Sequence, residues 1–239
     1  MQAIILAGGK GTRLRPYTTV LPKPLMPVGD YPILEIILRQ LKQAGFNEII
    51  LAVGHMSHLF EAFFQDGSRF GVNIHYSFEE KELGTAGPIA MAADKLKEDF
   101  LVMNGDVLTT LDYARLMGNH KARKAAATIS TFNREVKIDF GVLEGGKDNR
   151  LERYIEKPTY HFTVSMGVNV LSRDKVLPHL PVNQRMDIPE LMMKLHEAGE
   201  PVMLHHEPCF WLDIGRVDDY QAATEIFESR KAEFFPNGK

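Results

Sequence analysis

Cysteine is almost missing from this sequence, because Cys209 is the only one in 239 residues. A single thiol cannot form an internal disulfide, and chains without disulfides are typical of reducing compartments, so we expect a cytoplasmic location. The opening apolar run, Ala3 to Ala7, ends at Gly8 and is too short for a signal segment or a membrane span. It is typical of a buried strand, and we expect no membrane partner.

The chain also lacks a strong excess of charge of either sign. Its 28 basic and 31 acidic residues are interspersed and give a formal net charge of −3, so no basic face is offered to a nucleic acid polymer. Hydrophobic residues make up 44% of the chain, which is enough for a sizeable core. Internal repeats and low-complexity linkers are absent too, so we expect one domain over residues 1–239.

Apolar residues in the first half alternate between strand and helix patterns. An unbroken apolar run at 3–6 is typical of a strand covered on both faces, and helical spacing over 33–41 predicts a helix that stops near Gly45. Repeated units of this kind predict an α/β fold with a mostly parallel, doubly wound sheet. The ligand site of such a fold lies at the carboxyl ends of the strands, where Gly8 and Asn104-Gly105-Asp106 would meet. Further strands are expected at 49–53, 72–76 and 100–103, with a short helix at 59–64.

The pattern changes after about residue 125. Strands are expected at 126–132, 140–143, 151–156 and 165–171, and a closing amphipathic helix is expected at 217–235. Within the single domain, this predicts a first lobe at about 1–124 and a smaller, strand-rich lobe at about 125–239.

A glycine-rich segment, Gly8-Gly9-Lys10-Gly11-Thr12-Arg13, follows the first strand directly. Glycines let backbone amides approach a phosphate closely, although a tight strand-to-helix turn would use the same residues. A P-loop is excluded, because the nearest approach to its pattern ends in Asp148 where Ser or Thr is needed. A dinucleotide fingerprint fails as well, because Leu14 stands at its third glycine position.

The segment Gly8 to Pro16, together with Pro22-Lys23-Pro24, resembles the opening motif of the sugar-phosphate nucleotidyltransferase family. The resemblance extends through Trp211-Leu212-Asp213-Ile214-Gly215 to the closing helix. It implies a Rossmann-like nucleotidyltransferase fold with a nucleotide-binding and a sugar-binding lobe. It also implies an enzyme that joins a nucleoside triphosphate to a sugar 1-phosphate, releases pyrophosphate and uses Mg²⁺.

The resemblance assigns roles to particular residues. Arg13, Lys23 and Asp106 would be catalytic, and Asp106 and Asp213 would bind Mg²⁺, which prefers carboxylate and phosphate oxygens. Without the resemblance, an Asp after a strand is often a helix cap, and Asp213 would be a turn residue. Nucleotide contacts are implied for Leu6, Ala7, Gly8, Gly9, Gly11, Thr12, Gly84 and Thr85, and sugar-phosphate contacts for Gly141, Glu156, Lys157 and Asn169.

The substrates are less sharply indicated. Leu83 to Pro88 looks especially like the guanylyltransferase branch, which favours guanylyl transfer to a mannose-like sugar. Uridylyl or thymidylyl transfer to glucose, hexosamine or N-acetylmuramic acid 1-phosphate stays open, and so does a noncatalytic nucleotide-sugar sensor. Some relatives continue into hexapeptide repeats with a second activity, which we do not expect here, and the oligomeric state is unknown.

Overall fold

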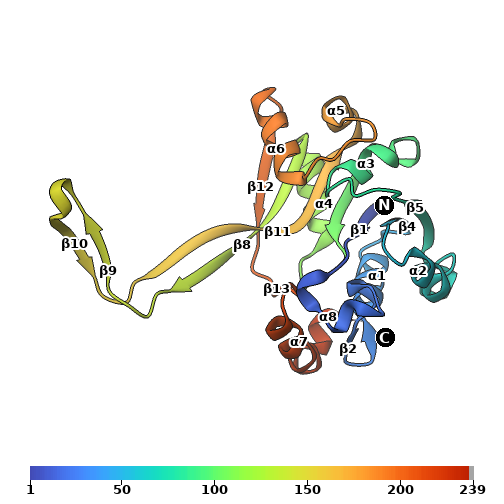
Figure 1. The fold of residues 1–239 in the computed structure, drawn as a ribbon. Helices are drawn as coiled ribbons and strands as arrows, with labels where there is room; N and C mark the ends of the chain where they lie inside the picture. The colour runs from blue at the N-terminus through green and yellow to red at the C-terminus, as the bar shows by residue number, and fades with distance from the viewer. Residues whose placement is uncertain (237–239) are drawn as a thin grey trace.

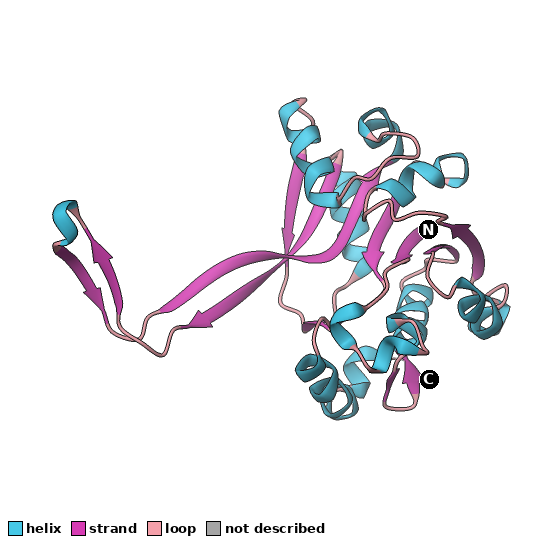
Figure 2. Ribbon diagram, in the orientation of Figure 1, coloured by secondary structure: helices cyan, strands magenta, loops and turns pink. Residues whose placement is uncertain are grey.

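Residues 1–236 are described by the computed structural model, and within them a seven-stranded sheet forms the centre of the protein (Figures 1 and 2). The strand order is β12-β8-β11-β6-β1-β4-β5. These strands are β1 Gln2–Ala7, β4 Glu48–Val53, β5 Asn73–Phe78, β6 Asp99–Asn104, β8 Ala127–Lys137, β11 Thr159–Ser172 and β12 Val202–His206.

Most neighbouring strands of this sheet are parallel. The pairs β12 with β8, β6 with β1, β1 with β4 and β4 with β5 run in the same direction, whereas β11 is antiparallel to both β6 and β8. The predicted α/β fold with a mostly parallel sheet is therefore confirmed.

Helices cover both faces of the sheet, as expected for a doubly wound fold. Side chains of β1 alternate between the faces, so that Ile5 joins one buried cluster and Ile4 joins the other. The first cluster includes residues of α1 Ile33–Gln43, α2 Ser57–Phe64, α4 Tyr113–Ala122, α7 Val217–Ser229 and α8 Lys231–Phe234. The second includes residues of α3 Gly87–Met91, α5 Arg173–Val176 and α6 Ile188–Glu197.

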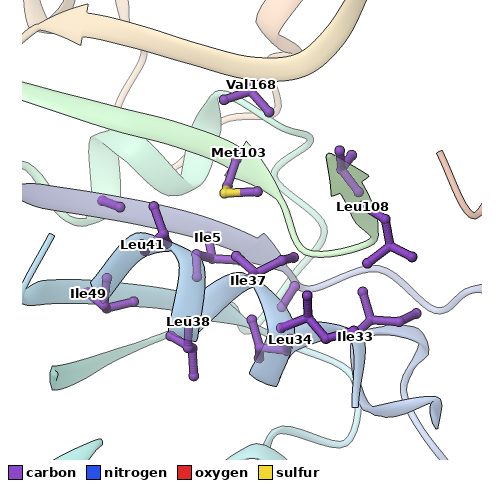
Figure 3. Packing of buried hydrophobic residues seen from close by; sticks show 14 of the residues in the cluster. Ile5, Ile33, Leu34, Ile37, Leu38, Leu41, Ile49, Met103, Leu108 and Val168 are labelled. Carbon is purple, nitrogen blue, oxygen red and sulfur yellow. The ribbon is translucent and has the colours of Figure 1, made fainter. Parts of the chain in front are cut away.

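The buried side chains between α1 and the sheet form part of the first cluster (Figure 3). Ile37 and Leu41 of α1 are fully buried, as are Ile5, Ile49 and Met103 of the strands beneath. Each such side chain contributes about 1.5–3 kcal/mol when it is removed from water. This packing holds the carboxyl ends of β1 and β6 in place.

The expected closing helix at 217–235 is divided in the structure. Its regular part, α7, ends before Arg230, whose backbone leaves the helical conformation, and α8 follows. The Arg230 guanidinium hydrogen-bonds Glu233 at 2.9 and 3.0 Å and lies 4.6 Å from the centre of the Phe210 ring. This break turns Phe234 into the core, where it is 1% exposed.

Beyond the sheet, β8 and β11 continue together as a two-stranded ribbon. We call residues 132–164 the arm. Figure 1 shows it leaving the body, with β9 Val142–Gly145 and β10 Leu151–Ile155 at its far end. The strands expected after residue 125 are thus present, but β8, β11 and β12 belong to the same sheet as β1. The division into two lobes at about residue 124 stays a prediction.

Short elements complete the described chain. They are β2 Pro27–Val28 with β3 Tyr31–Pro32, β7 Val107–Thr109 with β13 Trp211–Asp213, and several single 3-10 turns. None of the helices within residues 1–236 is long and apolar enough to cross a bilayer.

Candidate active site

The ends of β1 and β6 bring two distant sequence segments together. The two strands are parallel neighbours, with Leu6 opposite Asn104. The Gly105 amide donates a hydrogen bond of 2.9 Å to the Leu6 carbonyl. A Cβ on Gly105 would lie only 3.1 Å from that carbonyl oxygen, so glycine is favoured at this close approach. The glycine-rich loop and Asp106 consequently leave the sheet side by side.

The glycine-rich loop does not lead directly into an α-helix. Gly11 has a left-handed backbone with φ +60°, and a single 3-10 turn, Thr12–Leu14, follows it. Buried Leu14 and the Thr18 hydroxyl, which donates to the Gly11 carbonyl at 2.8 Å, hold this turn in place. The amides of residues 9–13 donate to no backbone carbonyl within residues 1–236. They are therefore available to an anion, and the strand-to-helix alternative does not describe the loop.

Lys23 and Asp106 form an ion pair at the floor of this edge. Lys23 lies on the 3-10 turn Lys23–Leu25 and is 7% exposed, and its Nζ bonds Asp106 Oδ2. The second oxygen, Asp106 Oδ1, is buried and has no protein hydrogen-bond partner. A buried carboxylate oxygen without a partner is costly, so this atom is a candidate ligand for a cation.

Asp213 reaches the same edge from a remote part of the chain. Strand β13 pairs antiparallel with β7, which sets Asp213 opposite Val107, and the Ile214 amide donates to the Asp106 carbonyl at 3.2 Å. Partial burial and the neighbouring Asp106 carboxylate raise the pKa of Asp213, although Lys23 and Arg13 oppose this shift. Residues 1–236 contain no group of three or more metal-binding side chains, so any cation here has at most these two carboxylates from the protein.

A cavity of about 390 Å³ opens at this edge of the sheet. All of the residues predicted to bind nucleotide, and all three predicted catalytic residues, line it: Leu6, Ala7, Gly8, Gly9, Gly11, Thr12, Arg13, Lys23, Gly84, Thr85 and Asp106. A second hollow of about 360 Å³ shares Arg13 and Gly215 with the cavity and is also lined by Asp213. The structure therefore brings the predicted nucleotide and metal residues together, whereas their roles stay predictions.

Gly84 and Thr85 form one wall of the cavity by contact with the start of α6. Gly84 has φ +74°, and a Cβ there would lie 2.5 Å from the Met186 carbonyl oxygen. The Thr85 amide donates to Asp187 Oδ1 at 3.0 Å, and its hydroxyl accepts from the Ile188 amide at 2.8 Å. Thr85 consequently does not cap α3, the alternative raised by the sequence, but bonds the first turn of α6.

The predicted sugar-phosphate residues are not brought to the cavity. Gly141, Glu156 and Lys157 lie on the arm, and Glu156 and Lys157 are exposed. Asn169 lies in β11 opposite Val102, is 3% exposed, and has a buried side-chain oxygen without a hydrogen-bond partner. Gly141, Glu156 and Lys157 lie far from the cavity along the chain. The strand pairs of β8 and β11 continue without a break outward from the Val164–Phe132 pair and carry these residues with them.

Glu79 is a cavity residue that no sequence motif indicated. It follows β5, lines the cavity, and accepts a hydrogen bond of 3.4 Å from the Leu83 amide. Burial raises the pKa of its carboxyl group. The rule that ligands bind at the carboxyl ends of parallel strands would have found Glu79, because β5 ends at Phe78.

Proteins similar to this chain in sequence are named as sugar-1-phosphate nucleotidyltransferases. A UTP–glucose-1-phosphate uridylyltransferase of Synechocystis is 34% identical over 249 residues, covering 97% of this chain and 64% of the relative. A mannose-1-phosphate guanylyltransferase of Mycobacterium tuberculosis is 34% identical over 227 residues, covering 92% of this chain and 62% of the relative. The chain thus spans less than two thirds of the length of these curated relatives.

Solved structures of similar fold include HddC from Yersinia pseudotuberculosis. It superposes with a TM-score of 0.74 at 24% identity, over 95% of this chain and 99% of that one. Its complex with GMP-PN gives a TM-score of 0.73 at 23% identity. At this identity the likeness concerns the fold.

The family assignment also has direct support from the sequence. A profile of the nucleotidyl transferase family matches residues 2–230, nearly the whole chain. The chain therefore belongs to the nucleotidyl transferase family.

Proposed function

We propose that the protein is a Mg²⁺-dependent sugar-1-phosphate nucleotidyltransferase, which joins a nucleoside triphosphate to a sugar 1-phosphate and releases pyrophosphate. The observation that carries the proposal is the cavity at the ends of β1 and β6. There the free amides of the glycine-rich loop, Arg13, the Lys23–Asp106 pair and an unpartnered carboxylate oxygen converge. Anion-binding and cation-binding groups in one cavity are what a metal–triphosphate complex needs.

The chain's own cations would bind the triphosphate. The loop amides and the planar guanidinium of Arg13 suit phosphate oxygens, because both offer several donors in a fixed arrangement. Lys23 is held by Asp106 and lines the same cavity. A phosphate bound there would therefore interact with a second cation besides Arg13. Catalysis of phosphoryl-type transfer is chiefly charge neutralisation and positioning, and these groups supply both.

Asp106 and Asp213 are the residues that would hold Mg²⁺. They fit because Asp106 Oδ1 is buried without a partner and because burial and the neighbouring Asp106 carboxylate raise the pKa of Asp213, which a bound cation would offset. Mg²⁺ commonly takes one or two protein carboxylates and completes its shell with phosphate oxygens and water. When bound, it would neutralise charge on the phosphates and assist the departure of pyrophosphate.

The transfer needs no protein nucleophile. A phosphate oxygen of the sugar 1-phosphate attacks the α-phosphorus of the nucleotide and forms a new phosphorus–oxygen bond. The bond from the α-phosphorus to the bridging β-phosphate oxygen breaks, and pyrophosphate leaves with the electron pair. Arg13 and Lys23 would stabilise the charge that develops during this exchange.

For the base, we favour guanine over uracil. Glu79 lines the cavity, and a carboxylate accepts hydrogen bonds from the two adjacent donors, N1–H and the exocyclic amino group, on the guanine edge. Uracil offers a single N–H between two carbonyl oxygens, which a carboxylate repels. The guanyltransferase relatives support this choice, while the uridylyltransferase relative keeps uridylyl transfer as the alternative.

For the sugar, we favour a mannose-like 1-phosphate. Gly141, Glu156, Lys157 and Asn169 are the proposed contacts, with Lys157 on the phosphate and Glu156 on hydroxyl groups. Glucose, hexosamine and N-acetylmuramic acid 1-phosphates are the alternatives.

The single Cys209 also leads us to propose the cytoplasm as the location.

A pyrophosphate-release assay tests the proposal. The purified protein is incubated with Mg²⁺, one of GTP, UTP, dTTP, CTP or ATP, and one of mannose, glucose, glucosamine, heptose or N-acetylmuramic acid 1-phosphate. We expect release with GTP and a mannose-like sugar, and none without the sugar phosphate or after EDTA is added. Binding of a nucleotide sugar with no release on any pair would overturn the enzyme and support a sensor.

A further inference from the structure

One face of the arm is largely apolar, and within residues 1–236 its outer part is exposed. Paired residues of an antiparallel ribbon point to the same side, and Tyr160 is paired with Val136 and Phe162 with Arg134. Successive even-numbered positions therefore share a face, which carries Phe132, Arg134, Val136, Tyr160, Phe162 and Val164. The opposite face carries Asn133, Glu135, Lys137, Thr159, His161 and Thr163.

The exposure of the apolar side chains on the arm is large. Phe162 is 51% exposed and Val136 is 39% exposed, although they lie on a regular ribbon. At the far end the exposed fractions are still higher, with Phe140 at 78% and Leu143 at 60%. In Figures 1 and 2 no other element of residues 1–236 lies beside the outer arm. An isolated two-stranded ribbon is marginally stable in water, so this surface needs a partner.

The apolar face begins at the active site. The Phe132 and Trp211 rings lie 5.4 Å apart, and Phe132 and Arg134 line the hollow that contains Asp213 and Arg13. From there the arm leads away. Glu156 is nine residues from Ser165 along the chain, which corresponds to about 30 Å of extended strand. The active site of one chain therefore lacks the arm residues that the proposed function requires.

We propose that two copies of this chain exchange arms, and that Glu156 and Lys157 of each copy complete the sugar-phosphate site of the other. The inference rests on the proposed function. It commits to a second copy because a twofold pair would cover both apolar faces and complete both sites by the same contact. Acidic and basic residues are equal in number over residues 132–164, so two arms can approach without net repulsion.

The alternative occupant is the chain's own body. To reach it, the arm would have to bend back near the register shift between Ser165 and Asn169, where Gly167 has φ +73°. The six consecutive pairs from Val164–Phe132 to Thr159–Lys137 would have to swing as a unit on that hinge. Exchange between copies needs no such movement.

Mixing two impaired variants distinguishes the two arrangements, when turnover is measured at a sugar 1-phosphate concentration well below the KM of Lys157→Ala. Asp106→Asn disables the cavity but keeps a normal arm, and Lys157→Ala keeps a normal cavity but impairs the arm. If arms are exchanged, a mixed dimer contains one complete site, and we expect about a quarter of wild-type turnover after subunit exchange. No recovery from verified mixed dimers, or full activity of Lys157→Ala alone, would overturn the proposal.

Oligomeric state provides a second test that does not depend on turnover. Phe162→Asp places a charge on the apolar face, while Thr163→Asp places the same charge on the opposite face of the same strand. By sedimentation, we expect the wild type to be a dimer, and Phe162→Asp to raise the dimer dissociation constant at least tenfold more than Thr163→Asp does.

The two tests separate the possible failures. A wild type that is monomeric and fully active would overturn arm exchange and leave the proposed function standing. A wild type that dimerises through the arm but releases no pyrophosphate on any pair would overturn the proposed function and, with it, the role given to Glu156 and Lys157.

Discussion

The carboxyl edge of the sheet and the arm contrast in how their residues are held. At the edge, Arg13 and Asp106 come shortly after β1 and β6, whose side chains are mostly buried on both faces, and Lys23 forms an ion pair with Asp106. On the arm, Glu156 and Lys157 follow a ribbon with an exposed apolar face. The edge is organised within one chain, whereas the arm has no layer to pack against.

The difference separates the two proposed substrate sites. The proposed nucleotide cavity is formed by loops on a buried core, so it is assembled before any substrate arrives. The proposed sugar-phosphate contacts lie where only an additional contact can hold them. Five predictions probe this contrast, from the largest expected effect to the smallest.

Ile37→Ala and Leu143→Ala compare the stability of the two regions. Ile37 is fully buried and Leu143 on the arm is 60% exposed. We expect Ile37→Ala to lower the free energy of unfolding by about 2–5 kcal/mol, because it leaves a cavity in the core. Leu143→Ala should change it by less than about 0.5 kcal/mol in dilute protein, as measured by urea unfolding. Equal losses would show that the arm is packed in solution.

Asp106→Asn should remove most turnover without unfolding the protein. Loss of a charged group that stabilises the transition state costs roughly 10²–10³-fold in kcat, or about 2.7–4 kcal/mol. Pyrophosphate release and circular dichroism measure the two properties. Asp94→Asn, at an exposed position near the opposite end of β6, is the control and should keep normal kcat. Near-normal turnover by Asp106→Asn would contradict the assignment.

Lys157→Ala should affect the sugar phosphate and spare the nucleotide. A hydrogen bond to a charged group contributes about 1.5–3 kcal/mol, so we expect KM for the sugar 1-phosphate to rise about 10- to 100-fold. KM for the nucleoside triphosphate should stay within about twofold, because the cavity is unchanged. Lys147→Ala, an exposed lysine at the far end of the arm, is the matched control. A parallel rise in both KM values would indicate a general effect on folding.

Glu79→Gln tests the base. If the carboxylate accepts two guanine donors, its neutralisation should lower kcat/KM for GTP about tenfold and change kcat/KM for UTP little. The adjacent Glu80 is exposed, so Glu80→Gln serves as the control. An equal loss with both nucleotides would argue that Glu79 supports the loop at Leu83 and does not select the base.

Asp213→Asn should have the smallest effect on stability, and in the stabilising direction. Because the pKa of Asp213 is raised, the folded protein keeps its proton at pH values where the unfolded chain has lost it. Stability therefore falls as pH rises through the window between the ordinary and the raised pKa, and the deficit persists above that window. At neutral pH, Asp213→Asn should have an equal or higher Tm than the wild type, with a smaller difference in acid, although turnover falls. A lower Tm at neutral pH would contradict this.

Much of the edge was predictable from the sequence. The apolar runs at 3–6 and 100–103 indicated buried strands, and the rule for parallel sheets placed Gly8 and Asp106 together. Glu79 was missed because no motif marked it, and Thr85 bonds the start of α6 in a way that required knowledge of a contact between residues far apart in the sequence. The break of the last helix at Arg230 depends on contacts with Glu233 and Phe210, which helical spacing alone does not report.

By itself, the sequence determined the fold class and the glycine-rich loop, because strand and loop patterns are local and the ends of parallel strands meet at one edge. Through its resemblance to a family, it also indicated many of the residues that line the cavity, although not Glu79. Only the tertiary structure decided where Asp213 and the arm lie. Asp213 reaches the edge through the pairing of β13 with β7, and Glu156 and Lys157 leave it because the ladder of β8 and β11 continues past the sheet. Pairing of strands distant in sequence depends on the packing of the whole chain, and no local pattern encodes it.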